Sequence, residues 1–238
     1  MSPLLLFLLL SAAWVVFLVV ERLHLDRNRR AIPLRVAVTG TRGKTSVVRL
    51  LAAVLRADGR EVLAKTTGSE AAYLLPDGTE QEIRRRGAPS IIEQKGLLRR
   101  GARLGVDAVV AEIMSVHAEK HRVEAHTILQ PHLVLVTNFR VDHPAAQGET
   151  PAEVARVLSL DVPAGARVFI LQEEWEPAFG EALGRTEAEI LNILKRRPAG
   201  PHNMQCDLRY HIKRIRKKLP PGWFIKAEYG TGMYRLAK

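Results

Sequence analysis

One segment of the sequence has residue types and spacing suited to phosphate binding, Gly-Thr-Arg-Gly-Lys-Thr at 40–45. It follows an apolar run at 34–39 and precedes a stretch with helical spacing, so it joins a strand to a helix. Its two glycines let main-chain N–H groups approach phosphate oxygens, and the helix amino end adds a positive dipole. The segment therefore predicts a nucleotide-binding loop. The loop residues are Gly40, Thr41, Arg42, Gly43, Lys44, Thr45 and Ser46.

Two side chains of this loop supply its chemistry. Lys44 is placed to contact the β and γ phosphates, and the Thr45 hydroxyl is placed to bind Mg²⁺. The usual P-loop pattern has another glycine five positions before Gly43, where this chain has Val38, so the loop is of a shortened kind. A glycine turn can also be a simple helix cap, but the order of strand, loop and helix favours a nucleotide site.

The elements that position the loop form an α/β pattern. Short apolar runs alternate with helical stretches between residues 34 and 171, which predicts a parallel sheet flanked by helices. A helix is expected over 45–57 with Gly59 as its left-handed cap, and another starts at the capping box of 150–153. The expected strands are 34–39, 61–65, 107–113, 132–137 and 166–171.

The amino-terminal segment fits a membrane anchor. Residues 3–20 carry no charge, and their number is close to the minimum of ~17 that spans a bilayer. Arginines follow this run and none precedes it, which places everything downstream in the cytoplasm by the positive-inside rule. A buried helix is disfavoured because the run is apolar on every face, and a cleaved signal would have a basic start. We expect a single-pass protein of the cell membrane.

Composition further limits the kinds of site and the domain organisation that this protein can have. The chain has 238 residues and a formal net charge of +11, and its single cysteine, Cys206, excludes an internal disulfide framework or a multi-cysteine metal site. The charge is concentrated near the carboxyl end, because residues 184–238 hold 13 basic but only 4 acidic side chains. Three units are expected: an anchor with a basic flank at 1–30, a nucleotide-binding domain at 31–182 and a basic domain at 184–238.

The loop segment and four later motifs resemble the ligase subunit of poly-γ-glutamate (capsule) synthases, within the Mur ligase and folylpolyglutamate synthetase superfamily. The resemblance covers roughly residues 1–182. It implies the central-domain fold of Mur ligases and amide formation that depends on ATP and Mg²⁺, in which a carboxylate is activated as an acyl phosphate and attacked by an amine. It also implies glutamate or a γ-glutamyl chain as substrate, with other capsule synthase membrane subunits as partners. The motifs are LRVAVTGTRGKTSVVRLLAAVL, AKTTG, IIEQKGLLRR, VVAEIMSV and NFRVDHPAAQG.

The resemblance also implies roles for single residues. Glu112, at the end of a buried strand, matches a magnesium ligand, and His143 matches the DH-motif histidine near a second magnesium. Hydroxyls of Thr66 and Thr67 can complete a metal shell or meet a phosphate. The expected catalytic residues are Lys44, Glu112 and His143. The expected metal ligands are Thr45, Glu112 and His143.

The sequence departs from the family at three points. Many Mur-type ligases have a carbamylated lysine where this chain has Leu158, and the second aspartate after the DH motif is Ala145 here. Nothing after residue 182 resembles the family's carboxyl-terminal domain, so the resemblance implies a truncated ligase. Glu93, Gln94 and Lys95 match the EQK block of the subfamily, to which the sequence assigns a position but no role.

A second candidate cluster is His117, His121 and Glu124, whose spacing on one helix face could bind zinc. It lacks the HExxH pattern and a further ligand, so a solvated helix face is the favoured interpretation.

The basic domain at 184–238 resembles the winged-helix effector domain of OmpR-type response regulators, with a helix, a basic helix and two short strands in 223–236. This resemblance implies binding to DNA and gives an alternative function, a membrane-tethered transcriptional regulator with an ATP-sensing domain. A basic helix against anionic lipid is a rival interpretation. The expected DNA contacts are Arg209, Lys213, Arg214, Arg216, Lys217 and Lys218.

Overall fold

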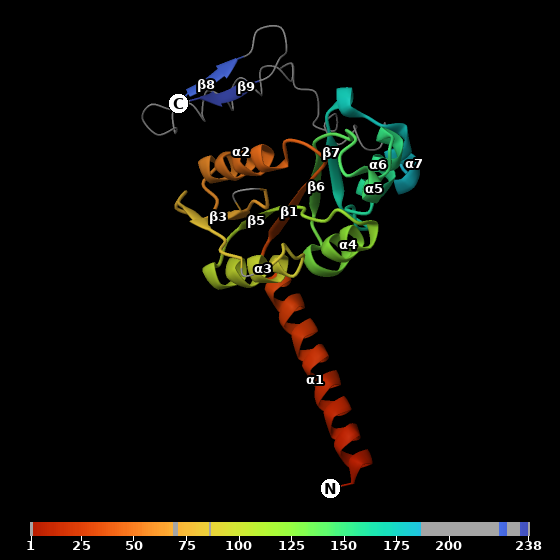
Figure 1. The fold of residues 1–238 in the computed structure, drawn as a ribbon. Coiled ribbons are helices and arrows are strands. Elements are labelled where there is room, and N and C mark those ends of the chain that lie inside the picture. The colour runs from red at the N-terminus through yellow and green to blue at the C-terminus, as the bar shows by residue number, and fades with distance from the viewer. Residues whose placement is uncertain (1, 69–70, 86, 187–223, 228–233, 238) are drawn as a thin grey trace.

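The computed structural model describes residues 2–68, 71–85, 87–186, 224–227 and 234–237. Figure 1 shows an α/β body from which one long helix projects. The body contains a seven-stranded sheet in the order β4-β3-β2-β5-β1-β6-β7. Five of these strands are parallel, and they are the five expected from the apolar runs. The strands are β1 (Leu34–Thr39), β2 (Val62–Lys65), β3 (Ala72–Leu74), β4 (Glu80–Glu82), β5 (Ala108–Glu112), β6 (Leu133–Val136) and β7 (Arg167–Ile170).

The sheet is mixed, which corrects the expectation of a purely parallel one. β3 pairs antiparallel with β2, and β4 pairs antiparallel with β3. Both have only three residues; β4 is exposed and has no apolar run, and β3 lies in a short one at 71–75 that was not predicted to be a strand. Their turn does carry a sequence signal, Pro76-Asp77-Gly78, in which Asp77 accepts hydrogen bonds from the N–H (2.9 Å) and hydroxyl (2.7 Å) of Thr79.

Helices cover both faces of the sheet (Figure 1). On one face α2 buries Val48 and Ala52 against Val36 and Val38 of β1. On the other face α3, η1, α6 and α7 contribute to the larger core, which includes Ala37. Because side chains alternate along a strand, β1 contributes side chains to the core on each face of the sheet. The loop that follows β1 therefore lies at the edge of the sheet, between the two layers of helices. The helices are α2 (Lys44–Ala57), α3 (Glu93–Leu104), α4 (Ala118–Arg122), η1 (Val123–Leu129, a π-helix), α5 (Pro144–Gln147), α6 (Pro151–Ser159), η2 (Gln172–Glu174) and α7 (Pro177–Leu183).

The two expected helix ends are confirmed. α2 stops near Gly59, whose φ of +90° is left-handed. At the start of α6 the Thr150 hydroxyl accepts from the Glu153 N–H (3.2 Å), and the Glu153 carboxylate accepts from the Thr150 N–H (3.1 Å). This reciprocal capping fixes where α6 begins.

The projecting helix is α1 (Pro3–Arg30), which continues through the whole basic flank. Its apolar part is exposed, and it is the one helix of the described residues that is long and apolar enough to cross a membrane. Its last turns belong to the body: Leu25 is buried, Arg29 donates to the carbonyl oxygen of Thr127 (2.7 Å), and Glu21 pairs with Lys95 (2.6 Å). The basic flank is therefore a structured connection between anchor and body.

Near the carboxyl end, β8 (Phe224–Ala227) pairs antiparallel with β9 (Tyr234–Ala237). This pairing confirms the two short strands expected there. The two helices expected between residues 186 and 219 lie outside the described residues.

Candidate active site

The phosphate loop joins β1 to α2 in a conformation that requires glycine. Gly40 has a φ of +123°, and a Cβ there would lie 2.0 Å from Oγ1 of Thr137. Gly43 has a φ of +82°, and a Cβ there would have no neighbouring atom within 4 Å, so only its backbone conformation favours glycine. The first glycine therefore serves close packing against the end of β6, and the second serves the turn into the helix.

The amino end of α2 presents unpaired donors. The N–H groups of Gly43, Lys44 and Thr45 have no acceptor among the described residues. Three converging donors at the positive end of a 14-residue helix form an anion-binding site. This is the geometry expected of a phosphate-binding loop.

Asn138 holds the other half of the loop. Its side-chain oxygen accepts from the Thr41 hydroxyl (2.6 Å) and the Arg42 N–H (3.2 Å), and its amide donates to the Arg42 carbonyl oxygen (3.0 Å). Asn138 belongs to the NFRVDH motif of the sequence, which predicted no role for it. The available signal was its position, a polar residue shortly after a buried strand at the carboxyl edge of the sheet.

Lys44 is folded back on its own loop. Its ammonium donates to the carbonyl oxygens of Gly40 (2.6 Å) and Thr41 (3.5 Å). Burial lowers the pKa of Lys44 below its ordinary value, although the negative charges of Glu112 and Asp161 oppose the shift. A phosphate oxygen could replace the Gly40 carbonyl as its acceptor, so the ammonium already lies where a bound phosphate would need it.

Glu112 connects the loop to the second motif. Its carboxylate accepts from the Thr45 hydroxyl (3.0 Å to each oxygen) and from the Thr67 N–H (2.9 Å). The group is buried, with 3% of its surface exposed. A carboxylate and a hydroxyl in contact beside a phosphate loop are hard oxygen ligands of the kind Mg²⁺ prefers, so Thr45 and Glu112 fit a magnesium ion.

These elements surround a cleft of about 550 Å³. His143 lines it from the start of α5, with a left-handed φ of +47° and an exposed side chain. Among the described residues, no three His, Cys, Asp or Glu side chains gather as a metal-binding group. The expected site residues that line the cleft are Gly40, Thr41, Lys44, Thr67, Glu112 and His143.

Of the other five expected site residues, Gly43 and Thr45 stay at the start of α2 beside the cleft, and three are placed elsewhere. Arg42 is exposed and pairs with Asp142 (3.3 Å), and Ser46 is exposed in the first turn of α2. Thr66 does not line the cleft; its hydroxyl bonds to the main chain of Ala72. That contact ties together the two ends of the connection between β2 and β3.

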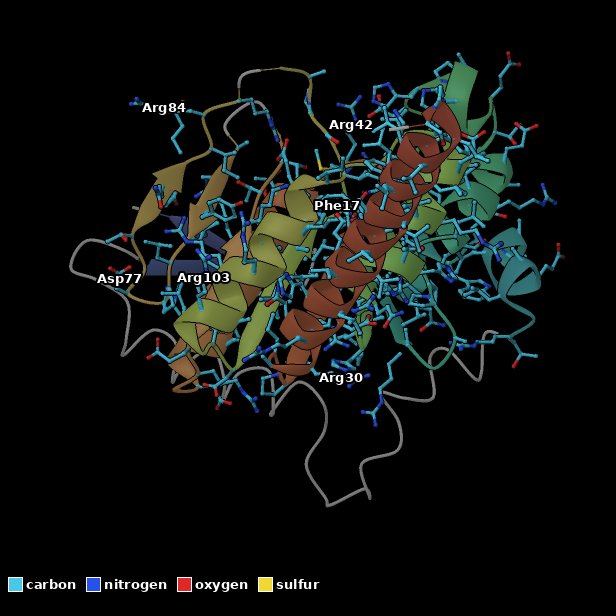
Figure 2. All side chains as sticks on the ribbon, turned by 90° about the horizontal axis from the view of Figure 1, so that it is seen from below. Phe17, Arg30, Arg42, Asp77, Arg84 and Arg103 are labelled. Atoms are coloured by element: carbon cyan, nitrogen blue, oxygen red, sulfur yellow. The ribbon has the colours of Figure 1, made fainter. Side chains whose placement is uncertain are left out.

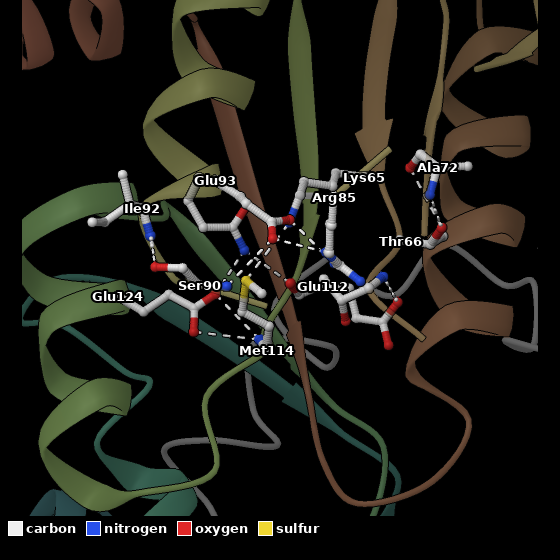
Figure 3. Close-up of polar contacts among 12 residues, drawn as sticks. Lys65, Thr66, Ala72, Arg85, Ser90, Ile92, Glu93, Glu112, Met114 and Glu124 are labelled. Carbon is white, nitrogen blue, oxygen red and sulfur yellow. Dashed lines mark hydrogen bonds and ion pairs between the residues drawn. The ribbon is translucent and has the colours of Figure 1, made fainter. Parts of the chain in front are cut away.

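The EQK block connects three elements through consecutive residues (Figure 3). Glu93 pairs with Lys65 of β2 (3.1 Å) and with Arg85 (2.8 Å). Gln94 donates to the main-chain oxygen of Glu112 (3.0 Å), and Lys95 pairs with Glu21 of α1. The start of α3 is therefore fixed to the end of β2, the end of β5 and the anchor helix.

Lys65 is an unusual member of this cluster because its side chain is fully buried. Burial lowers the pKa of Lys65, and the Glu93 carboxylate opposes the shift. Burial also acts to raise the pKa of Glu93, but the hydrogen bond from Arg85 and the charge of Lys65 outweigh it and leave that pKa lowered. The partners stay charged together, which keeps a buried cation tolerable.

The expectation of a solvated helix face at His117, His121 and Glu124 is wrong. His117 is exposed, but His121 and Glu124 are buried at 1% and 0% exposure. Glu124 accepts from the Ser115 hydroxyl (2.5 Å) and from Gln94 (2.6 Å), as Figure 3 shows in part. Burial raises the pKa of Glu124 against these hydrogen bonds. The cluster is structural, because the chain folds these polar groups inward onto partners.

His121 belongs to a separate buried chain of hydrogen bonds. Its Nδ1 contacts Asp161 (2.8 Å), and Asp161 accepts from the Thr39 hydroxyl (2.5 Å) just before the phosphate loop. Burial lowers the pKa of His121, but the charge and hydrogen bond of Asp161 outweigh it and leave the pKa raised. Sequence reasoning missed Asp161, which lies 122 positions from Thr39 and carries no local motif.

The expected DNA contacts at 209–218 lie outside the described residues. Only β8 and β9 of that domain are described, so the winged-helix interpretation stays a prediction.

The sequence family agrees with this geometry. The family model of the Mur ligase middle domain matches residues 38–156, from the end of β1 into α6. The chain therefore belongs to the Mur ligase middle-domain family. The resemblance to that superfamily, expected from the loop and its partner motifs, is confirmed.

Two curated proteins are similar to this chain in sequence. The chain is 29% identical over 188 residues to PGA synthase CapB of Bacillus subtilis, covering 77% of this chain and 48% of that protein. It is 26% identical over 187 residues to the capsule biosynthesis protein CapB of Bacillus anthracis, covering 78% of this chain and 39% of that protein. The chain thus spans less than half the length of either relative.

Solved structures share the fold. Escherichia coli FolC in complex with ADP matches with a TM-score of 0.54 at 19% identity, over 73% of this chain and 48% of that one. A bifunctional folylpolyglutamate synthase/dihydrofolate synthase from Yersinia pestis, complexed with AMPPNP and Mn, gives 0.55 at 17% identity, over 73% and 49%. The α/β fold of Mur-type ligases is thereby established for the body.

Proposed function

We propose that this chain is the nucleotide-binding part of an ATP- and Mg²⁺-dependent amide ligase of the poly-γ-glutamate synthase type. The observation that carries the proposal is the contact of Glu112 with Thr45 and Thr67, which places a buried carboxylate against a phosphate loop. The similarity to PGA synthase CapB supports the proposed substrate class, glutamate or a γ-glutamyl chain. The proposed site residues also include Asn138, which shapes the loop. Those retained from the sequence are Gly40, Thr41, Gly43, Lys44, Thr45, Thr67, Glu112 and His143.

Different residues of this chain would bind the nucleotide phosphates, hold Mg²⁺ and orient the substrate carboxylate. The N–H groups of Gly43, Lys44 and Thr45 bind the nucleotide phosphates, and the Lys44 ammonium exchanges the Gly40 carbonyl oxygen for a phosphate oxygen. Thr45 and Glu112 hold Mg²⁺, which neutralises charge that develops during phosphoryl transfer. His143 lines the same cleft and is proposed to orient the carboxylate that accepts the phosphoryl group.

The reaction proposed is amide formation in two steps. The γ-phosphoryl group moves from ATP to a carboxylate oxygen, which leaves ADP and an acyl phosphate. An amine then attacks the acyl carbon, phosphate departs and the nitrogen loses a proton. Because the chain spans less than half of the CapB relatives, we propose that further capsule synthase subunits or segments complete the acceptor side.

We also propose that α1 is a single membrane span with the body in the cytoplasm. The support is an 18-residue window of mean hydropathy 2.7 and the basic residues that follow it. Alkaline carbonate extraction of membranes tests the anchor: the full chain stays in the pellet, and a variant with Leu8→Arg and Val15→Arg is released. Release of the unaltered chain would contradict the anchor and leave the ligase proposal intact.

The ligase proposal is tested by measuring ADP release from ATP and Mg²⁺ with and without glutamate. Glutamate-dependent release that disappears in Lys44→Ala supports the ligase. Lys95→Ala is the matched control, since it removes a lysine outside the cleft. ATP binding without turnover, together with DNA binding lost in Arg214→Ala plus Lys217→Ala, would instead support the regulator alternative.

A further inference from the structure

A second hollow lies between α1 and α3, and Ser90 lines both this hollow and the cleft. It has a volume of about 1090 Å³ and is bounded by the last turns of α1, by α3 and by the connection between β4 and α3. Figure 2 shows this side of the body from below, with α1 running across it and with Arg84 and Arg103 on the side of α3. We call this hollow the anchor groove.

Cationic side chains outnumber carboxylates in the lining of the anchor groove by six to two. Three elements contribute them, although these elements are far apart in the sequence. The groove includes two carboxylates, Glu21 and Glu93. The lysine and arginine residues are Arg27, Arg84, Arg85, Lys95, Arg99 and Arg103.

Both carboxylates already have cationic partners. Glu21 pairs with Lys95 (2.6 Å), and Glu93 pairs with Arg85 (2.8 Å) and with Lys65 behind it. The side chains of Arg27, Arg99 and Arg103 are exposed and make no hydrogen bond or ion pair with any described residue. The groove therefore gathers positive charge that the described part of the chain does not neutralise.

The height of the groove follows from helix geometry. A helix rises 1.5 Å per residue, so Arg27 lies about 10 Å beyond Val20, the end of the uncharged run. The headgroup layer of a bilayer is about 5–8 Å thick on each side of its hydrocarbon core. With α1 inserted along the bilayer normal, the near end of the groove at Glu21 and Lys95 lies within the headgroup layer, and Arg27 lies just beyond it.

The rim of the groove adds apolar surface. Ile92 lines it and has 63% of its surface exposed. An anionic lipid can contact both the arginines and the apolar rim of the groove. Its headgroup would pair with the arginines, and its glycerol or acyl carbons would contact the rim. A γ-linked polyglutamate chain offers the apolar rim only the short methylene pairs between its carboxylates.

We propose that the anchor groove binds the headgroup of an anionic phospholipid of the cytoplasmic leaflet. The proposal depends on the membrane anchor proposed above and is independent of ligase chemistry. Basic pockets beside membrane helices on the cytoplasmic side commonly bind acidic lipid headgroups.

The test uses the full chain in neutral detergent, stripped of lipid, and native mass spectrometry to count bound short-chain lipids. We expect dihexanoyl phosphatidylglycerol to bind at least about tenfold more tightly than dihexanoyl phosphatidylcholine. The triple variant Arg27→Gln, Arg99→Gln and Arg103→Gln should lose this preference. The matched control, Arg60→Gln, Arg122→Gln and Arg156→Gln, removes the same charge from exposed arginines that do not line the groove and should keep it.

Several results would overturn the proposal. Equal binding of the two lipids removes the anionic preference, and equal losses in both triple variants show that net charge, not the groove, attracts the lipid. A γ-linked hexaglutamate that binds at the same arginines and is not displaced by phosphatidylglycerol shows that the groove takes a polyanion chain. ATP binding by the groove variant, measured by calorimetry, shows that it is folded and separates this test from the ligase proposal.

Discussion

The active-site cleft and the anchor groove both collect charged side chains, but they do so in opposite ways. In the cleft each charge is held by short directional contacts: Lys44 by Gly40, and Glu112 by Thr45 and Thr67. In the groove the side chains of Arg27, Arg99 and Arg103 have no partner among the described residues. The contacts in the cleft hold individual atoms in fixed positions, as catalysis requires. The exposed arginines of the groove provide a positive electrostatic potential that can attract an anion in many orientations. Single substitutions should therefore have large effects in the cleft and graded effects around the groove.

The largest expected effect comes from Gly40→Ala. A Cβ at this position would lie 2.0 Å from Oγ1 of Thr137, and the φ of +123° adds backbone strain of about 1–3 kcal/mol. We expect affinity for Mg-ATP to fall by about a hundredfold or more, as measured by calorimetry. Gly43→Ala is the control, since it has a left-handed φ but open space, and should cost only about fivefold. Equal losses would show that the contact with Thr137 is unimportant.

A smaller and more selective effect is expected from Glu112→Gln. The amide keeps the size of the carboxylate beside Thr45 but removes its charge, so phosphoryl transfer should slow by about a hundredfold while ATP binding changes by less than about tenfold. Single-turnover ADP release and calorimetry separate the two quantities. Glu119→Gln on exposed α4 is the control. Unchanged turnover in Glu112→Gln would remove Glu112 from the catalytic residues.

His121→Asn tests the rigid support of the cleft. The change leaves Asp161 buried without its imidazole partner, which should lower the free energy of unfolding by about 2–4 kcal/mol. Because the folded-state pKa of His121 is raised above 6.5, its contribution is fully present below that pH and is lost as pH rises through the folded value. Denaturant unfolding from pH 5.5 to 8.5 should show the wild type and variant converging at high pH. A constant difference would contradict this linkage.

The smallest effect is expected from Lys95→Met at the border between the two regions. The pair of Lys95 and Glu21 is 32% and 43% exposed, so its loss should change the free energy of unfolding by less than about 1 kcal/mol. Chemical denaturation in detergent measures this change. A decrease in the free energy of unfolding of more than about 2 kcal/mol would mean that the contact between α3 and α1 stabilises the protein as much as contacts in the cleft do.

The fold was predictable where local patterns determine it. The five parallel strands were found because each is a short apolar run, and the start of α6 was found because its capping box is local. β3 and β4 were missed because three residues carry too little pattern. The sequence of a buried parallel strand is informative because both of its faces are covered.

The site was predictable only as far as its motifs extend. Lys44, Thr45 and Glu112 follow from the loop and the end of a strand, whereas Asp161 reaches Thr39 only through the tertiary fold. The burial of His121, Glu124 and Lys65 could not be read from their residue types, because polar residues are mostly exposed unless a partner is present. Those partners lie on other elements, so no local pattern identifies them.

The continuity of α1 has a mechanical consequence. Its 28 residues form a rod about 42 Å long that is fastened to α3 and η1 without an intervening loop. A body mounted on such a rod cannot swing as it would on a flexible tether. With α1 inserted as proposed, tilting it in the bilayer tilts the whole body, so the tilt of α1 sets the orientation in which a neighbouring membrane protein meets the body.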